Sequence, residues 1–335
     1  MRKAFQQTFT FLFLGIAFCC AASAQAIKVT LLGTGYPQPR MDRFGPSTLV
    51  EAGGLRLLFD CGRGCSQRLD SQGTGVAGVS VIFFTHLHSD HIVGFPDLWL
   101  TGWIAGRETP MQVFGPEGTE AMAAHLTQAY GFDIHIRRDV DEKLQGEGWK
   151  LTAKDIEPGV VFQNDGVKVT AIAVDHGPVK PAFGYRVDYA GHSVVLSGDT
   201  RFCENLIASA QGTDVLIHEV MSGIPASPPA ATTPAATLSA ATTPSGAPVP
   251  ASISSAMAAR VQEHHTSPEQ AAIVFSRVKP KLAVYYHVIG SEQQIEDVTR
   301  KGYSGPFIVG SDLMEIDIGD HVEVRRLGPD AKQER

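Results

Sequence analysis

The chain has 335 residues, five of them cysteine, and a formal net charge of −7. This length is enough for one large domain or two small ones. A net-acidic protein lacks the electrostatic footprint of a nucleic-acid binder, because neutralising a phosphate backbone requires clustered Lys and Arg. We therefore expect no nucleic acid among its partners.

The N-terminus has the pattern of a secretory signal. Arg2 and Lys3 precede an apolar run from Phe9 to Cys20, and Ala22-Ser23-Ala24 then supplies a small-residue cleavage site. An apolar run of about a dozen residues is too short to span a bilayer. We expect residues 1–24 to be a cleaved signal peptide and the mature protein to be periplasmic or secreted, without a membrane anchor.

The cysteines bear on anchoring and on disulfides. A lipid-bearing cysteine normally follows a small residue, whereas Cys19 and Cys20 follow Phe18 and Cys19, so a lipoprotein anchor is the less favoured alternative. An odd number of cysteines in an exported protein argues against a disulfide scaffold and leaves at least one thiol free unless chains are linked. The sequence leaves open how the three remaining cysteines pair: Cys61, Cys65 and Cys203.

The first predicted strands are short and end in glycine loops. After a strand at 27–32, the segments 47–51 and 55–60 flank Gly53-Gly54, which is the pattern of a hairpin. A glycine loop then leads into a short predicted helix at 65–69. Such a step could cradle an anion, but it lacks the G-x-x-x-x-G-K spacing, so a phosphate site is only weakly indicated.

A stretch of 13 residues, 79–91, carries four side chains of metal-ligand type at the end of a buried strand. Its first half is an apolar, β-branched and aromatic run too short for a helix. His86 and His88 could bind one ion on an extended segment, and Asp90 and His91 could bind a second at the following turn. Two neighbouring cations can share a water and lower its pKa toward neutrality. A solvated loop is the alternative, but this density of ligands favours half of a dinuclear hydrolytic centre.

Several further elements follow from the pattern of apolar and turn residues. Residues 133–159 are charged and irregular, with Ile134 and Ile136 as a candidate edge strand. The predicted helices are 92–105 and 117–130, and the predicted strands are 111–114, 160–162, 167–174, 183–189, 193–197 and 215–217.

Two polar residues in the second half could complete the metal site. His176 and Asp199 each lie at the C-terminal end of an apolar strand, beside glycine. Alone, each would be interpreted as a turn residue. The cluster at His86 cannot close two coordination spheres by itself, so we expect both to be ligands, with the Asp199 carboxylate bridging two ions.

The C-terminal part contributes further histidines. Thr266 as cap with Glu269 three residues later predicts a capping box and a helix at 269–278, which holds His265 at its N-terminal entrance. The buried strand 282–286 ends at His287. The preceding strand 215–217 similarly ends at His218 and Glu219.

A composition change interrupts the chain at about 222–259. This segment is mostly Ala, Pro, Thr, Ser and Gly, and it has too little apolar surface to offset its ordering entropy. We expect a flexible insertion, either a tolerated surface loop or a substrate lid. The rest of 25–335 is expected to form a single domain.

With these positions in place, the chain resembles the metallo-β-lactamase superfamily, and within it the ribonuclease Z-like branch that also contains secreted arylsulfatases. The resemblance covers nearly the whole mature chain. Its motifs are Leu32-Gly33-Thr34-Gly35, Phe59-Asp60-Cys61-Gly62-Arg63-Gly64, Thr85-His86-Leu87-His88-Ser89-Asp90-His91, Gly198-Asp199-Thr200, His218-Glu219 and His265-Thr266-Ser267.

The resemblance implies an α+β fold, a four-layer αββα sandwich with the metal site at one edge of two facing sheets. It implies two divalent metal ions, for which imidazole and carboxylate suit zinc first, and iron or manganese also. His86, His88 and His176 would bind the first ion, Asp90, His91 and His287 the second, and Asp199 would bridge them. The implied catalytic residues are Asp90, His265 and Glu219. His265 would protonate the leaving oxygen, and Glu219 would orient the His265 ring. Asp60 would orient a ligand histidine.

Two departures from tRNA-processing members narrow the expected function. The interval between His176 and Asp199 has no room for the tRNA-binding arm of those enzymes, and the pair Arg43-Phe44 replaces their R-N pair. The insertion also contains no basic residue before Arg260. We therefore expect an exported dinuclear zinc hydrolase that cleaves a small phosphodiester or aryl sulfate ester by attack of a bridging hydroxide.

Other functions remain open on the same residues. The site could hydrolyse a lactone or β-lactam, or the chain could be a ribonuclease Z-type tRNA 3′-end endonuclease by resemblance only. A non-catalytic binding protein is the least favoured, because all seven ligands are present. The resemblance suggests a homodimer, and the sequence does not settle the substrate, the metal, the role of the insertion or the oligomeric state.

Overall fold

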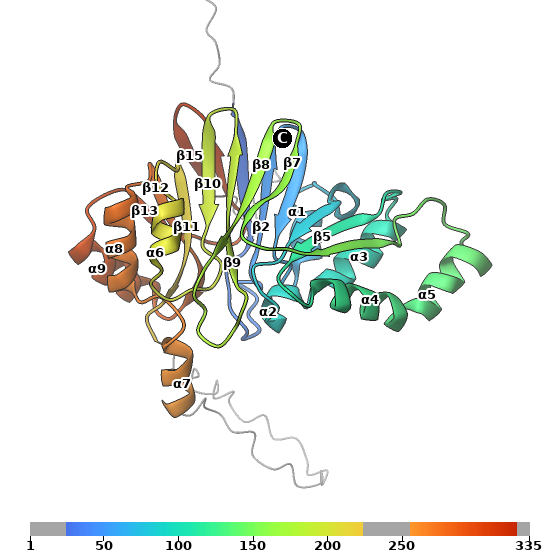
Figure 1. Ribbon diagram of the computed structural model, residues 1–335, viewed down its shortest axis with the longest axis horizontal. Coiled ribbons are helices and arrows are strands. Elements are labelled where there is room, and N and C mark those ends of the chain that lie inside the picture. Colours follow the sequence, from blue (N-terminus) through green and yellow to red (C-terminus); the bar gives the residue numbers. More distant parts are fainter. Residues whose placement is uncertain (1–24, 224–254, 327–335) are drawn as a thin grey trace, which may run out of the picture.

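The computed structural model describes residues 25–223 and 255–326 (Figure 1). The predicted signal peptide and most of the predicted insertion therefore lie outside the described residues. Structure resumes with helix α7 (Ser255–Gln262), which begins within the segment expected to be flexible. No helix of the described part is both long and apolar enough to cross a membrane.

Two mixed sheets form the centre of the molecule (Figure 1). The first has the strand order β15-β14-β1-β2-β3-β4-β5-β6, and the second has the order β13-β12-β11-β10-β9-β8-β7. The first sheet comprises β1 (Ile27–Gly33), β2 (Ser47–Ala52), β3 (Leu55–Phe59), β4 (Val81–Phe83), β5 (Met111–Gly115), β6 (Leu151–Asp155), β14 (Met314–Ile318) and β15 (Val322–Arg326). The second comprises β7 (Gly159–Asn164), β8 (Val167–Ala173), β9 (Phe183–Tyr189), β10 (His192–Leu196), β11 (Val215–Met221), β12 (Leu282–Ile289) and β13 (Phe307–Val309).

The two sheets face each other across an apolar core. Alternate residues of each strand point inward, and the rings of Phe59, Phe83 and Tyr185 lie within 5.0 to 5.6 Å of one another, centroid to centroid. The Tyr185 hydroxyl is buried in this core, and it donates a hydrogen bond to the carbonyl of Phe84 at 2.7 Å, so it is not left unpaired. Burial of both inner faces holds the sandwich together.

Helices cover the two outer faces (Figure 1). One cluster of buried side chains joins α1 and α3 to the first sheet, and a second joins α6, α8 and α9 to the other sheet. The helices are α1 (Cys65–Ser71), α2 (Ser89–Ile92), α3 (Phe95–Ile104), α4 (Thr119–Ala129), α5 (Gly131–His135), α6 (Glu204–Ser209), α8 (Pro268–Val278) and α9 (Glu292–Gly302), besides α7. The expected four-layer αββα arrangement is therefore confirmed.

The helix predicted at 92–105 is in fact two helices, because α2 ends at Ile92 and α3 begins at Phe95. Gly94 lies at the break, where its N–H donates to the Cys61 carbonyl at 2.9 Å. A Cβ at Gly94 would lie 2.2 Å from the carbonyl oxygen of Gly62. This backbone contact with the 60–65 loop, which the helical pattern does not encode, separates the two helices.

The segment 133–159 was wrongly expected to be irregular with an edge strand at its start. Residues 131–140 are helical, first as α5 and then as a π-helical turn, and β6 pairs in parallel with β5. Ile134 is 4% exposed and packs in the core beneath the first sheet. The high local charge hid these elements because it lies on the solvent side.

Asp214 joins the starts of three neighbouring strands in the second sheet. Its side chain accepts from the Ser193 N–H at 2.8 Å and pairs with Lys281 Nζ at 2.8 Å, and its carbonyl accepts from the Leu282 N–H at 3.1 Å. Burial alone would raise the pKa of Asp214, but the Lys281 and Ser193 contacts outweigh burial and lower it.

We predict that Asp214→Asn destabilises the protein by about 1–2 kcal/mol at pH 7, since a charge-assisted bond is replaced. A lowered carboxyl pKa contributes stability that is present above the unfolded pKa and is lost as pH falls through the folded pKa. The difference in unfolding free energy from wild type, measured by urea titration, should therefore shrink as the pH falls below the ordinary carboxyl pKa of 3.8 and through the lowered pKa of the folded state. Exposed Asp70→Asn is the control, and an equal effect at every pH would contradict the role of the charge.

Candidate metal centre

The predicted ligands come together at one edge of the sandwich, from the ends of three strands and from within a fourth. Residues 86–91 follow β4 and enter α2, His176 follows β8, Asp199 follows β10, and His287 lies within β12. Five groups of three ligand-type side chains lie here, with the ligand atoms of each group within 4.8 Å of one another. Such separations match donor atoms arranged around a single cation.

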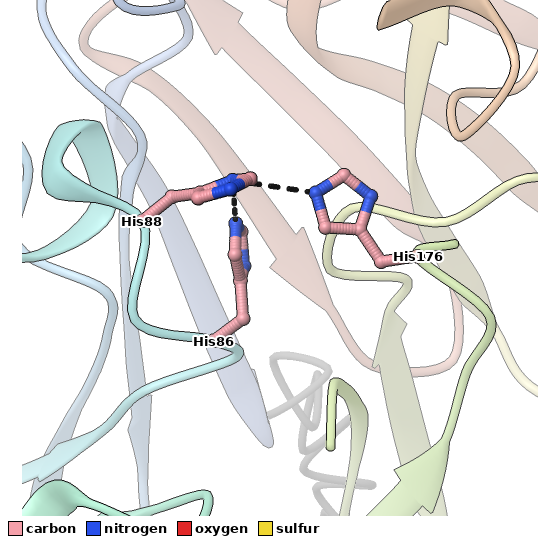
Figure 2. Close-up of side chains that lie close together, drawn as sticks. All are labelled: His86, His88 and His176. Atoms are coloured by element: carbon pink, nitrogen blue, oxygen red, sulfur yellow. Dashed lines mark hydrogen bonds between the residues drawn. The ribbon is translucent and has the colours of Figure 1, made fainter. Parts of the chain in front are cut away.

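Three histidines form the first group. Figure 2 shows the rings of His86, His88 and His176 pointing toward one another from two separate loops. His88 Nδ1 lies 3.0 Å from His86 Nε2 and 3.4 Å from His176 Nε2. Burial lowers the pKa of His86 well below 6.5 and that of His176 to about 4. Both rings are therefore neutral, as a metal ligand must be.

A second group lies beside the first. His287 Nε2 lies 3.4 Å from Asp90 Oδ2, and His91 Nε2 lies 3.7 Å from the same oxygen. His91 and His287 are at most 1% exposed, so a cation between them would be shielded on the protein side. Asp90 supplies the negative charge of this group.

Asp199 stands between the two groups. Its Oδ2 is 3.4 Å from Nε2 of both His91 and His287, 3.9 Å from Nε2 of His86 and 4.0 Å from Nε2 of His176. Its Oδ1 is buried and has no hydrogen-bond partner among the described residues. A buried carboxylate with an unused oxygen at the centre of four imidazoles fits two divalent cations that share one ligand.

Hydrogen bonds to the second ring nitrogens orient three of the histidines. Asp60 accepts from the Thr85 N–H and hydroxyl, each at 2.8 Å, and its Oδ2 lies 2.8 Å from His91 Nδ1. His176 Nδ1 lies 3.0 Å from the His264 carbonyl, and His86 Nδ1 lies 3.0 Å from the Thr85 hydroxyl. These contacts leave Nε2 free to face the centre, which is how such partners usually hold metal-binding histidines.

The backbone at His287 is strained. Its φ is +47°, and the β11–β12 register shifts here, so His287 is an extra residue inside a parallel pair. A bulge of this kind redirects the side chain, which no longer follows the alternation of side chains between the two faces of the sheet. Such backbone strain concentrates at functional sites. The sequence predicted a strand ending at His287, whereas β12 continues to Ile289.

Glu219 and His265 form a buried pair next to the ligands. Glu219 Oε1 accepts from the backbone N–H groups of Thr200 at 3.1 Å and Thr266 at 3.0 Å, and it lies 3.1 Å from His265 Nδ1. Burial would lower the pKa of His265, but the charge and hydrogen bond of Glu219 raise it to about 9. The His265 ring stacks on the His287 ring with centroids 5.6 Å apart.

The segment that presents His265 is capped one residue later than predicted. The N-cap of α8 is Ser267, whose hydroxyl and Gln270 make the reciprocal capping-box bonds. The Thr266 hydroxyl donates instead to the Thr200 carbonyl at 2.5 Å. The predicted box failed because this tertiary contact occupies the side chain of Thr266, which also ties His265 to the Asp199 loop.

A polar network that the sequence did not reveal fixes the loop 34–46. Asp312 accepts from the backbone N–H and hydroxyl of Thr34 and from the Phe44 N–H, at 2.7 to 2.9 Å. Arg43 is 6% exposed and donates to Thr34 and to the Gly310 carbonyl. Asp312 has no motif around it, so only its tertiary contacts identify it.

A cavity of about 200 Å³ opens beside the centre. The ligands form one side of it, and an apolar wall forms the other. Its lining comprises Tyr36, Pro37, Gln38, His88, Asp90, Asp199, Met257, Val261, His264, His265, His287 and Ile289.

Cys61 and Cys65 form a disulfide, and Cys203 is free and buried. The disulfide closes the loop behind the centre, where the Cys61 N–H donates to the His91 carbonyl at 2.8 Å. The three cysteines of the described residues thus form one local bridge and one buried thiol.

We predict that Cys65→Ser lowers the free energy of unfolding by about 2 kcal/mol, since a short loop is released in the unfolded chain. It should also weaken metal binding, because the loop carries Asp60 and contacts the backbone of His91. Urea titration and metal competition against a chromophoric chelator would measure both. Cys203→Ala should leave metal affinity unchanged, and equal affinity in both variants would contradict a role for the bridge at the centre.

Comparisons with known proteins agree with this architecture. The family model described as Beta-lactamase superfamily domain matches residues 55–288, more than half of the chain. A protein named Ribonuclease Z from Mycobacterium avium (strain 104) is 34% identical over 300 residues, covering 87% of this chain and 98% of the relative. Another Ribonuclease Z, from Mycobacterium bovis (strain BCG / Pasteur 1173P2), is 33% identical with the same coverage.

Solved structures show the same fold. The metallo-β-lactamase fold protein YhfI from Bacillus subtilis superposes with a TM-score of 0.62 at 16% identity, over 86% of this chain and 98% of that chain. Human tRNase Z, short form, superposes with a TM-score of 0.60 at 21% identity, over 87% of this chain and 99% of that chain.

These findings overturn two expectations. The prediction of a small phosphodiester or aryl sulfate ester as substrate was wrong, because the relatives matched over nearly their full length are named Ribonuclease Z. The prediction that nucleic acid is excluded was wrong for the same reason. The net charge is a sum over the whole chain, whereas binding of RNA depends on the charges near the site that it contacts. Exposed Arg63 donates to the carbonyl of cavity residue Pro37 at 3.3 Å, so a cation lies beside the cavity of this net-acidic protein.

The resemblance to the superfamily is confirmed by the matched family model, by the relatives and by the fold. The chain belongs to the beta-lactamase superfamily and is a hydrolase of its metallo-β-lactamase fold, with close relatives named Ribonuclease Z.

Proposed function

We propose that the protein is a metal-dependent ribonuclease of the ribonuclease Z type, which hydrolyses a phosphodiester bond at the 3′ side of a tRNA precursor. The observation that carries this proposal is the 34% identity to a Ribonuclease Z over 98% of that relative's length. The converging ligands and the Glu219–His265 pair supply the chemistry that such a reaction needs.

The ligand groups would hold two cations. His86, His88 and His176 suit one, the group around Asp90 suits the other, and Asp199 suits both. We propose zinc, because neutral imidazoles and carboxylates are its usual ligands. Two such cations would supply Lewis acidity to a phosphate oxygen and to the attacking water.

The residues of the chain would perform the proton transfer. His265 lies on the cavity side of the ligands and is held by Glu219, so its ring is positioned to give a proton to the departing ribose oxygen. Glu219 is fully buried and bonded by two backbone N–H groups, which keeps its carboxylate in place during that transfer. The products would be a ribose hydroxyl and a terminal phosphate.

A precursor tRNA with a 3′ trailer tests the proposal. The purified protein, loaded with zinc, should release the trailer at one position, resolved by gel electrophoresis and mass spectrometry. His86→Ala measures the background from contaminating nucleases. Cleavage by the wild type that does not exceed this background would overturn the proposed function.

We also propose that the protein is exported. The signal-like N-terminus supports this, and so does the Cys61–Cys65 bridge, since disulfides persist in oxidising compartments. The mature protein from a periplasmic fraction should begin at Gln25 and carry one free thiol, measured by intact-mass spectrometry after thiol alkylation. A full-length chain with five free thiols in the cytoplasm would contradict export.

A further inference from the structure

The cavity beside the metal centre has two chemically different walls. One wall is polar and carries the ligands together with His264 and His265. The other is apolar, with Tyr36 from the 34–46 loop, Ile289 from β12, and Met257 and Val261 from α7. Tyr36 and Ile289 pack together with Met221 and Val261 in a cluster of their own, separate from the cores of the sandwich.

The part of the apolar wall formed by Tyr36 and Ile289 is fixed by its neighbours, whereas Met257 on α7 is 53% exposed. Tyr36 is 7% exposed and Ile289 is 3% exposed, so both are held by their neighbours. The Tyr36 hydroxyl donates to Gln38 Oε1 at 3.2 Å, which gives this polar tip a partner within the same loop. Gln262 Nε2 donates to the Met221 carbonyl at 3.2 Å and attaches α7 to the end of β11.

The size of the cavity limits what it can hold. A volume of about 200 Å³ is below the roughly 300–1,000 Å³ of sites for drug-sized ligands. It fits one planar ring system and excludes a duplex. Apolar and aromatic side chains are the surfaces on which single nucleobases stack.

The apolar wall adjoins the segment that carries the proton donor. Val261, His264 and His265 belong to one short segment, and the His264 N–H donates to the Val261 carbonyl at 3.3 Å. A group that contacts Val261 and Tyr36 in this cavity would therefore lie near His265.

We propose that this wall, formed by Tyr36, Met257, Val261 and Ile289, binds the base of the nucleotide whose ribose oxygen leaves. The inference rests on the proposed function. In the reaction, the water oxygen bonds to phosphorus and gives up a proton to solvent, the bond from phosphorus to the ribose oxygen breaks, and that oxygen receives the His265 proton. A stacked base fixes the leaving nucleotide during this transfer and makes the enzyme select an unpaired base at the cleavage position.

A fluorescence experiment tests the contact without turnover. The probe is a short RNA in which a methylene replaces the departing oxygen and 2-aminopurine replaces the adjacent base. Binding to the zinc-loaded protein should quench this fluorophore severalfold, because stacking quenches it. The quench should be largely lost in Tyr36→Leu and reduced in Val261→Ala, which is the milder change, and retained in Ile273→Ala, an exposed site on α8. Equal quenching in all four proteins would overturn the proposal.

A kinetic experiment locates the base. Removing the base on the leaving side of a cleavable RNA should lower kcat/KM of the wild type by about tenfold, the effect of one stacked base. The same removal on the other side should have little effect, and Tyr36→Leu should respond weakly to both. Equal losses on both sides would overturn the assignment. Absence of any RNA cleavage, with quenching intact, would instead reject the proposed function and leave the ring-binding wall standing.

Discussion

Replacing Asp199 by asparagine should lower kcat/KM for RNA by at least about a thousandfold. Its carboxylate lies within 4.0 Å of Nε2 of four histidines from both ligand groups. Lewis-acid assistance from metal ions is worth several kcal/mol, and each 1.36 kcal/mol is tenfold in rate. Losing the shared ligand should therefore remove most of the acceleration.

The metal content distinguishes this effect from misfolding. Wild type should bind two ions per chain by elemental mass spectrometry, and Asp199→Asn fewer. The rise in melting temperature on adding zinc should shrink in the variant, because a ligand that binds the native state stabilises it in proportion to its affinity. Asp175→Asn, one residue from His176 and partly exposed in a pair with Arg201, is the matched control. Two tightly bound ions in Asp199→Asn would contradict the bridging role.

His265→Ala should slow RNA cleavage by about 10²–10⁴-fold, the usual contribution of a general acid. The loss should depend on the leaving group, because a nitrophenolate departs without a proton whereas a ribose oxygen does not. A nitrophenyl phosphodiester used as a reporter should therefore be cleaved at nearly the wild-type rate. Steady-state kinetics on the two substrates measures the contrast.

Two further variants complete that experiment. Glu219→Gln keeps an acceptor for the Thr200 and Thr266 N–H groups but loses the charge beside His265, so its loss should be smaller and show the same dependence on leaving group. His125→Ala, exposed on α4, should match wild type on both substrates. An equal loss on RNA and on the reporter in His265→Ala would remove His265 from the role of acid.

Much of the site was predictable because its residues are adjacent in the sequence. His86, His88, Asp90 and His91 lie within six residues, and no common structural role requires that density of ligands. His176 and Asp199 could be added because each follows an apolar strand, and strand ends that share a sheet edge meet in space. His287 was added through the resemblance to the superfamily, and it lies within β12 rather than after it. The sheets were similarly visible as short apolar runs.

The substrate class was predicted wrongly in part because the net charge of the whole chain was taken to describe the site. A net charge of −7 says little about the few ångströms around a cleavage site. The missing arm between His176 and Asp199 removes one way of holding RNA, but relatives named Ribonuclease Z still align over nearly their full length. Similarity across the whole domain is the stronger evidence, because it samples every part of the fold.

The sequence by itself determined the ligand cluster of residues 86–91 and made His176 and Asp199 candidate ligands, since these rest on local patterns of strand, turn and ligand type. The sandwich fold, the role of His287 and the pair of Glu219 and His265 came from the resemblance to the superfamily. Only the tertiary structure decided features that depend on contacts between distant segments. These features are the Asp312 contacts that hold the loop 34–46, the bulge at His287, the break between α2 and α3 at Gly94, and the apolar wall of the cavity from Tyr36 to α7. Their physical cause is backbone approach and shared burial between residues up to 278 positions apart, and no local pattern in the sequence records such contacts.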